Sequence, residues 1–119
     1  MKKIWILFIF LSSFAFSYEE LNIGNFDNKI KGKNVIVDFY AVWCAPCKVL
    51  AQNLVEFDEL KEKDVTIYKV NVDKEYFLAD KYRARALPSL YFFKDGKLVK
   101  KTVGLISTQK ILEHSEKLF

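Results

Sequence analysis

Two cysteines separated by two residues are the part of the sequence best suited to chemistry. Cys44 and Cys47 are the chain's only cysteines and stand in the segment WCAPCK. They follow an apolar, strand-like run and precede a stretch with helical spacing, so Cys44 is expected where a helix begins. The unpaired N–H groups and the positive dipole end of a helix favour an anion at this position. We therefore expect the pKa of the Cys44 thiol to lie below its usual value of ~8.5, which favours the thiolate.

The spacing of the two cysteines also allows them to bridge. Helical residues three apart have Cβ atoms about 5–6 Å from each other, whereas a disulfide needs about 3.5–4.5 Å. A non-helical Cys44 at the cap position would close this gap without unwinding the helix. Pro46 suits the first helical turn, where a missing N–H leaves no hydrogen bond unmade. A Cys-x-x-Cys pair that opens a helix after a strand is typical of thiol–disulfide exchange.

Three other interpretations of the cysteine pair stay open at this stage. A purely structural disulfide would close a very short loop and would stabilise the fold little. A zinc site would need two further ligands, and the only histidine, His114, lies far along the chain. Two inert, buried thiols are the third alternative. The strand-then-helix context favours the redox dithiol over all three.

A carboxylate in an apolar strand is the second candidate for chemistry. Asp38 stands in VIVDFY, where every neighbour is apolar. Burial of an unpaired carboxylate is unfavourable, so the pKa of Asp38 should be raised. Asp38 precedes Cys44 by six residues and could lie beneath the dithiol, where a carboxyl group can exchange a proton with a thiol. An Asp that reaches water from its strand position is the alternative. Lys69, in the next predicted strand, is expected to approach Asp38, although a solvent-exposed lysine is the alternative.

The elements that must position these residues alternate between strands and helices. Apolar runs predict strands over 34–41, 64–72 and 89–93, and the turn KDGK predicts a hairpin to a fourth strand over 98–103. Helical spacing predicts helices over 47–61 and 74–82, a short one near 26–30, and a last one capped by Ser107. Asp73 is expected to cap the 74–82 helix. This order predicts a mixed α/β sheet with helices on both faces.

The first seventeen residues have the pattern of an export signal. Lys2 and Lys3 precede an uncharged, mostly apolar run over 4–16, and Ala15 and Ser17 are small residues at the positions that a signal peptidase favours. This run is short for a membrane span, which needs about 20 residues. We predict a cleaved signal peptide over 1–17 and one domain over 18–119, with an uncleaved anchor as the alternative. An exported protein meets an oxidising compartment, where a disulfide can persist.

Composition excludes several other classes of protein. The chain has 119 residues, 51% of them hydrophobic, which is enough for one domain with a core. Its formal net charge is +4, which falls to +2 without residues 1–17, and no block of Lys and Arg suggests nucleic-acid binding. Two cysteines are too few for a disulfide-rich scaffold.

Taken together, these segments resemble the thioredoxin family over nearly the whole of residues 18–119. The resemblance is carried by VDFYAVWCAPCK, YKVNVD, ALPSLYFFKDGK and Val103–Gly104. It implies the thioredoxin fold, an α/β fold with a mixed four- to five-stranded sheet and helices on both faces. It also implies that Cys44 is the attacking nucleophile, Cys47 the resolving thiol, Asp38 the buried acid–base group and Lys69 its partner.

The resemblance further implies a substrate groove beside the dithiol. It makes Leu87–Pro88 a cis peptide whose backbone pairs with an extended substrate. The residues implied for substrate binding are Trp43, Ala45, Pro46, Leu87, Pro88 and Gly104. Ala45 and Ala86 replace glycines usual in thioredoxins proper, so the resemblance alone does not set the reduction potential or the choice of substrate.

The function expected from the sequence is an exported thiol–disulfide oxidoreductase that reduces protein disulfides. Its expected partners are disulfide- or thiol-bearing proteins and a membrane electron donor. We expect a monomer with a periplasmic or secreted location, and no cofactor or metal beyond the redox-active Cys44–Cys47 pair. One alternative is an oxidase or isomerase of secreted-protein disulfides. Another is a peptide-binding module in which redox activity is incidental.

Overall fold

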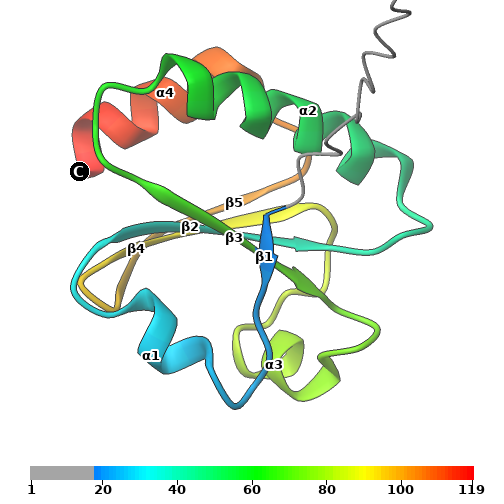
Figure 1. Ribbon diagram of the computed structural model, residues 1–119. Helices are drawn as coiled ribbons and strands as arrows, with labels where there is room; N and C mark the ends of the chain where they lie inside the picture. Colours follow the sequence, from blue (N-terminus) through cyan, green and yellow to red (C-terminus); the bar gives the residue numbers. More distant parts are fainter. Residues whose placement is uncertain (1–17) are drawn as a thin grey trace, which may run out of the picture.

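Five strands form one mixed sheet with β2 at its centre (Figure 1). The structure, a computed structural model, describes residues 18–119. The spatial order is β1-β3-β2-β4-β5, in which β2 runs parallel to β3 and antiparallel to β4. The strands span β1 Glu19–Glu20, β2 Asn34–Tyr40, β3 Thr66–Asn71, β4 Ser89–Lys94 and β5 Lys97–Val103. The predicted mixed sheet is confirmed, with β1 as an additional short edge strand that the sequence did not suggest.

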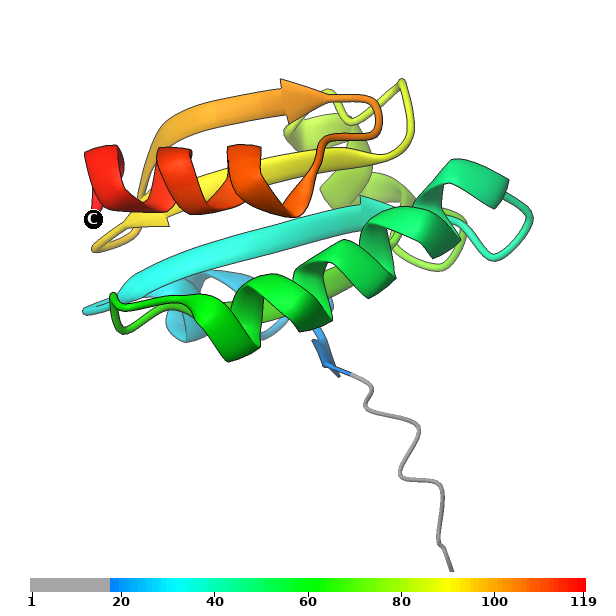
Figure 2. The same cartoon turned by 90° about the horizontal axis from the view of Figure 1, so that it is seen from above.

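In the described part of the chain, two helices cover each face of this sheet (Figures 1 and 2). α2 (Ala45–Leu60) and α4 (Thr108–Leu118) pack on one face, and α1 (Phe26–Ile30) and α3 (Tyr76–Lys81) on the other. Within residues 18–119, none of the helices combines the length and the apolar character needed to cross a membrane.

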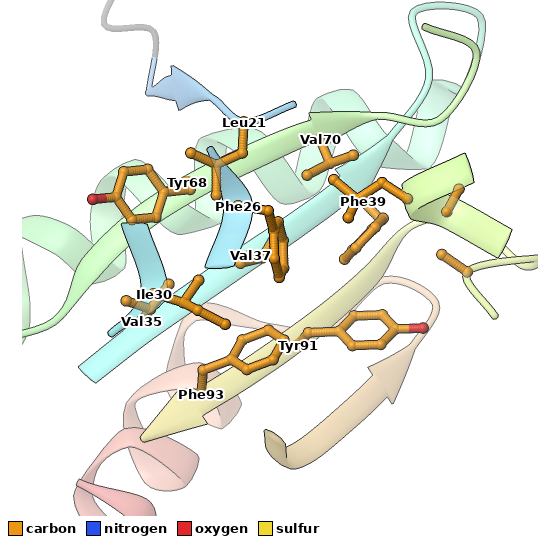
Figure 3. Close-up of a cluster of buried hydrophobic side chains, with 13 residues drawn as sticks. Leu21, Phe26, Ile30, Val35, Val37, Phe39, Tyr68, Val70, Tyr91 and Phe93 are labelled. Carbon is orange, nitrogen blue, oxygen red and sulfur yellow. The ribbon is translucent and has the colours of Figure 1, made fainter. Parts of the chain in front are cut away.

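Alternation along β2 divides its side chains between these two layers. Val35, Val37 and Phe39 belong to the buried cluster on the α1 and α3 side, which Figure 3 shows. Ile36 belongs to the cluster beneath α2 and α4. Because successive side chains of a strand point to opposite faces, Asp38 shares the face of Ile36. The strand therefore directs its one carboxylate toward the layer that contains α2.

The α2 helix follows directly from the cysteine segment. Its N-cap is Cys44, and Pro46 stands in its first turn. Leu50, Leu54 and Phe57 are buried, as their spacing predicts. The same spacing places Leu60 or Lys61 near this face. Leu60 is 55% exposed, whereas Lys61, the C-cap residue with extended backbone, is half-buried.

The last two helices show one correct and one incorrect cap prediction. The side chain of Ser107 accepts a hydrogen bond from the N–H of Lys110 at the start of α4, which confirms the predicted cap. Asp73 does not cap α3. That helix begins only after Glu75, which makes no side-chain cap, and the Asp73 carboxylate instead bonds to Trp43.

Candidate active site

The two cysteines at the start of α2 lie close enough for their sulfurs to be bonded. Cys44 and Cys47 form a disulfide with their Cα atoms 5.3 Å apart. Cys44 has extended backbone, with φ −89° and ψ 107°, and its sulfur accepts the N–H of Cys47 at 3.2 Å. The non-helical cap residue expected from the sequence is therefore present. A backbone N–H directed at this sulfur would also stabilise a thiolate there.

Asp38 and Lys69 lie on adjacent strands directly opposite each other. The parallel register pairs Asp38 of β2 with Lys69 of β3, so their side chains leave the sheet on the same face. Asp38 is only 5% exposed, and its Oδ1 makes no hydrogen bond within residues 18–119. The Lys69 ammonium lies 5.3 Å from the centre of the Tyr40 ring. The structure thus brings together the two residues that the sequence analysis paired.

Burial controls the protonation of this carboxyl group. Loss of hydration raises the pKa of Asp38 to about 7, and the positive charge of Lys69 opposes this rise without cancelling it. Removing a carboxylate from water penalises its charged form. Asp38 therefore exchanges its proton near neutral pH, as a general acid or base does.

A cavity joins this carboxyl group to the disulfide. It has a volume of about 250 Å³, and its walls include Asp38, Lys69 and Cys47. The remaining lining residues are Tyr40, Ala41, Val42, Lys48 and Ala51. A cavity of this size with polar groups in its wall has room for water. Asp38 and Cys47 therefore face a common space through which a proton can pass.

The loop before β4 forms another wall of the site. The Leu87–Pro88 peptide bond is cis, as the family resemblance implied. Leu87 packs against the buried cluster of Ala41, Cys44 and Cys47. Gly104 donates its N–H to the Pro88 carbonyl at 2.8 Å. Its φ is +89° and no atom stands within 4 Å of where a Cβ would be, so glycine suits the backbone and leaves this rim open.

Trp43 directly precedes the first cysteine of the disulfide. The residue is 71% exposed, yet its Nε1 donates to Asp73 Oδ2 at 2.9 Å. Ala45 and Pro46 are exposed at the first positions of α2. Trp43, Ala45 and Pro46 therefore surround the disulfide on the solvent side. The groove residues implied by the resemblance all lie at this end of the sheet.

Three contributors to the site were not identified from the sequence. The Tyr40 hydroxyl donates to Glu20, and the Tyr40 ring contacts Lys69. Val72 packs against the cluster that contains the two cysteines, and Asp73 orients Trp43. No local pattern marks these residues, since each contact joins segments that are distant in the sequence.

Other titratable groups do not assemble into a metal centre here. Among residues 18–119, no three side chains of His, Cys, Asp or Glu are close enough to one another to hold a metal ion. Because both cysteine sulfurs are bonded to each other, the chemistry of this arrangement is the making and breaking of that bond.

Comparisons with known proteins agree with this geometry. The family model described as Thioredoxin matches residues 17–117. Thioredoxin of Mycoplasmoides gallisepticum is 42% identical over 81 residues, which is 68% of this chain and 80% of the relative. Thioredoxin of Staphylococcus aureus is 38% identical over 94 residues, which is 79% of this chain and 90% of the relative.

Solved structures show the same fold. Oxidised mitochondrial thioredoxin 3 of Saccharomyces cerevisiae superposes with a TM-score of 0.77 at 30% identity, over 85% of this chain and 95% of the other. A mutant thioredoxin of Halobacterium salinarum also gives 0.77, at 29% identity, over 85% and 89% of the two chains. The fold implied by the sequence resemblance is therefore confirmed.

The raised pKa of Asp38 predicts how its removal changes stability. The folded state prefers protonated Asp38, so this group's contribution to stability is complete below about pH 4 and is lost as pH rises through about 7. Asp38→Asn should leave the free energy of unfolding of the oxidised protein nearly unchanged at pH 4. At pH 8 it should raise that free energy by roughly 3–4 kcal/mol. Urea unfolding at the two pH values measures both.

Asp64→Asn is the matched control, because Asp64 is exposed and its replacement should give no such dependence. An Asp38→Asn effect of equal size at pH 4 and pH 8 would show that burial does not raise the pKa of this carboxyl group.

Proposed function

Because this chain belongs to the thioredoxin family and is a thiol–disulfide oxidoreductase, we propose that it reduces protein disulfides outside the cytoplasm. The observation that carries the redox proposal is the disulfide at the start of α2 with a buried carboxyl group facing the same cavity. Thioredoxins act on thiol-bearing protein substrates, and the open rim at Trp43 and Gly104 gives such a substrate access to the sulfurs.

The first step of the proposed reaction takes place at Cys44. In the reduced protein its thiolate, at the N-cap of α2, attacks one sulfur of a substrate disulfide. The substrate's S–S bond breaks, a mixed disulfide forms with Cys44, and the other substrate sulfur leaves as a thiolate that takes up a proton. Both cysteines are buried. Cys44 stands at the N-cap between the exposed Trp43 and Ala45, whereas Cys47 lines the internal cavity, and this difference supports Cys44 as the attacker.

The second step releases the substrate. Asp38 accepts the proton of the Cys47 thiol across the cavity, and the resulting thiolate attacks the Cys44 sulfur. The second substrate sulfur leaves as a thiolate. Cys44 and Cys47 are thereby oxidised to a disulfide, and their two electrons have reduced the substrate disulfide to two thiols. Lys69, next to Asp38 in the register, limits the charge that builds up on that carboxyl group.

The extended backbone of the substrate would lie along the Leu87–Pro88 segment. Leu87 packs against the cysteine cluster, and the exposed Ala45 and Pro46 leave space over the sulfurs. Main-chain pairing of this kind tolerates many side chains. The site needs no cofactor beyond its own disulfide, but the oxidised protein needs two electrons from a reduced dithiol, for which we propose a membrane protein as donor.

Export is supported by the sequence of residues 1–17, which lie outside the residues the structure describes. Lys2, Lys3 and the apolar run over 4–16 fit a signal peptide that ends at Ser17. The domain over 18–119 would then act in the periplasm or outside the cell, as a monomer. An uncleaved run would instead tether the same domain to the membrane.

Replacing Cys47 by Ser should trap the reaction at its first step. Without a resolving thiol, Cys44 should accumulate as a mixed disulfide with substrate, seen as a mass increase that dithiothreitol reverses. Cys44→Ser, which leaves the deeper cysteine in place, should accumulate at least about tenfold less adduct. Equal trapping by the two variants would contradict the assignment of Cys44 as the attacker.

The reduction potential of residues 18–119 distinguishes a reductase from an oxidase. We expect a value near ~−270 mV, as for thioredoxin, when the protein is equilibrated with glutathione buffers. A value near ~−120 mV would establish an oxidant instead. Between these limits, each difference of about 30 mV changes the equilibrium between the oxidised and reduced protein by about 1.4 kcal/mol.

Export predicts a defined N-terminus. When the full chain is expressed in a bacterium with two membranes, N-terminal sequencing of the periplasmic fraction should begin at Tyr18. Ile9→Arg, which interrupts the apolar run, should retain the protein in the cytoplasm as full-length chain. Full-length protein in the membrane fraction of the unaltered chain would establish the anchor, and full-length protein in the cytoplasm would refute export.

A further inference from the structure

Two aromatic side chains beside the redox site take no part in the mechanism above. Tyr76 and Phe77, at the start of α3, are 68% and 74% exposed. Their rings are 5.7 Å apart in an edge-to-face arrangement. Isolated exposed apolar residues are ordinary on protein surfaces, but these two stand together, beside a hollow of the surface that one of them lines.

The hollow lies between α3 and the loop that leads to the cis proline. Its volume is about 330 Å³, which is within the range of about 300–1,000 Å³ of sites that hold small ligands. Its lining residues are Val72, Tyr76, Ala79, Asp80, Ala84 and Arg85. Most of this lining is apolar, and its charged groups are one carboxylate and one guanidinium.

Val72 lies between this hollow and the redox site. The same residue that lines the hollow also packs against the cluster that contains Cys44 and Cys47. From the other direction, Asp73 holds the exposed Trp43 through its hydrogen bond, three residues before Tyr76. The hollow therefore adjoins the redox site at Val72 and Asp73, close enough for one extended chain to contact both.

The polar groups of the hollow are available to a peptide. Neither Asp80 nor Arg85 forms a side-chain ion pair within residues 18–119. A guanidinium donates to backbone carbonyl oxygens and a carboxylate accepts backbone N–H groups. Together with an apolar lining and exposed aromatic rings, which are enriched in binding surfaces, these groups suit an extended peptide with a large apolar side chain.

We propose that Tyr76, Phe77 and this hollow form a specificity site for extended protein segments that carry a large apolar side chain near the reactive cysteine. The proposal rests on the proposed reductase function and adds the class of its substrates. Folded proteins bury their large apolar side chains. The site therefore favours disulfides of unfolded or misfolded proteins, in which such side chains flank exposed cysteines.

A series of peptide disulfides measures this preference. Each peptide carries one cysteine capped by glutathione, with Phe or Ser at successive positions on either side of it. At the best position the unaltered protein should show about tenfold higher kcat/KM for Phe than for Ser, equivalent to about 1.4 kcal/mol. Tyr76→Ser/Phe77→Ser should reduce this ratio to about one. Leu60→Ser should keep the ratio, because Leu60 is 55% exposed at the opposite end of α2.

A second measurement does not depend on redox activity. Cysteine-free versions of the Phe peptides, added to the oxidised protein, should shift the amide NMR signals of Val72, Tyr76 and Arg85, and the Ser versions should not. Failure of the unaltered protein to reduce hydroxyethyl disulfide would refute the proposed function but would leave this binding test decisive.

Three results would overturn the specificity site. The first is equal rates for Phe and Ser peptides at every position, and the second is a Phe preference that survives Tyr76→Ser/Phe77→Ser. The third is that the Phe peptides shift no signal near the hollow, whereas the double substitution abolishes binding to anionic lipid vesicles or self-association in sedimentation. That result would assign the aromatic pair to a different partner.

Discussion

The position of β2 constrains everything else in this molecule. It is the central strand, paired with β3 and β4, and five of its seven residues are buried. A strand covered on both sides has to be apolar at nearly every position, and Asp38 is the one charged residue in it. The chain then leaves the end of this strand through Ala41 and enters α2 at Cys44, so the sulfurs lie directly beyond the centre of the sheet.

The burial of Asp38 is unfavourable for its charged form but brings its pKa into the range of proton transfer at neutral pH. A carboxylate in water would titrate far below neutral pH, whereas loss of hydration brings the pKa of Asp38 to about 7. In the proposed reaction this carboxylate accepts the proton of the Cys47 thiol, with which it shares a cavity. Perturbed titration of this kind is characteristic of functional sites. Lys69 from β3 and the Tyr40 ring, held by Glu20, complete the polar side of the cavity.

The solvent side of the site is assembled from loops instead of strands. Gly104 is hydrogen-bonded to Pro88, Trp43 is hydrogen-bonded to Asp73, and Leu87 and Val72 pack on the cysteine cluster from two other segments. These contacts are made at the ends of β3, β4 and β5, so the sheet sets the spacing between them. The exposed aromatic residues of α3 adjoin these segments through Val72, which lines the hollow beside Tyr76.

Local sequence determined the features that depend on neighbouring residues. The order of strands and helices, the cap at Ser107, the non-helical Cys44 at the start of α2 and the unfavourable environment of Asp38 all follow from patterns within a few positions, where backbone geometry and apolar periodicity act. Family resemblance, and not local physics, supplied the cis Leu87–Pro88 bond. Tertiary structure alone decided that Asp73 holds Trp43 instead of capping α3, that Glu20 forms an edge strand and binds Tyr40, and that Val72 packs against the cysteine cluster. Each of these contacts joins segments distant in the sequence, and its partner is selected by the sheet register and packing, which no local pattern encodes.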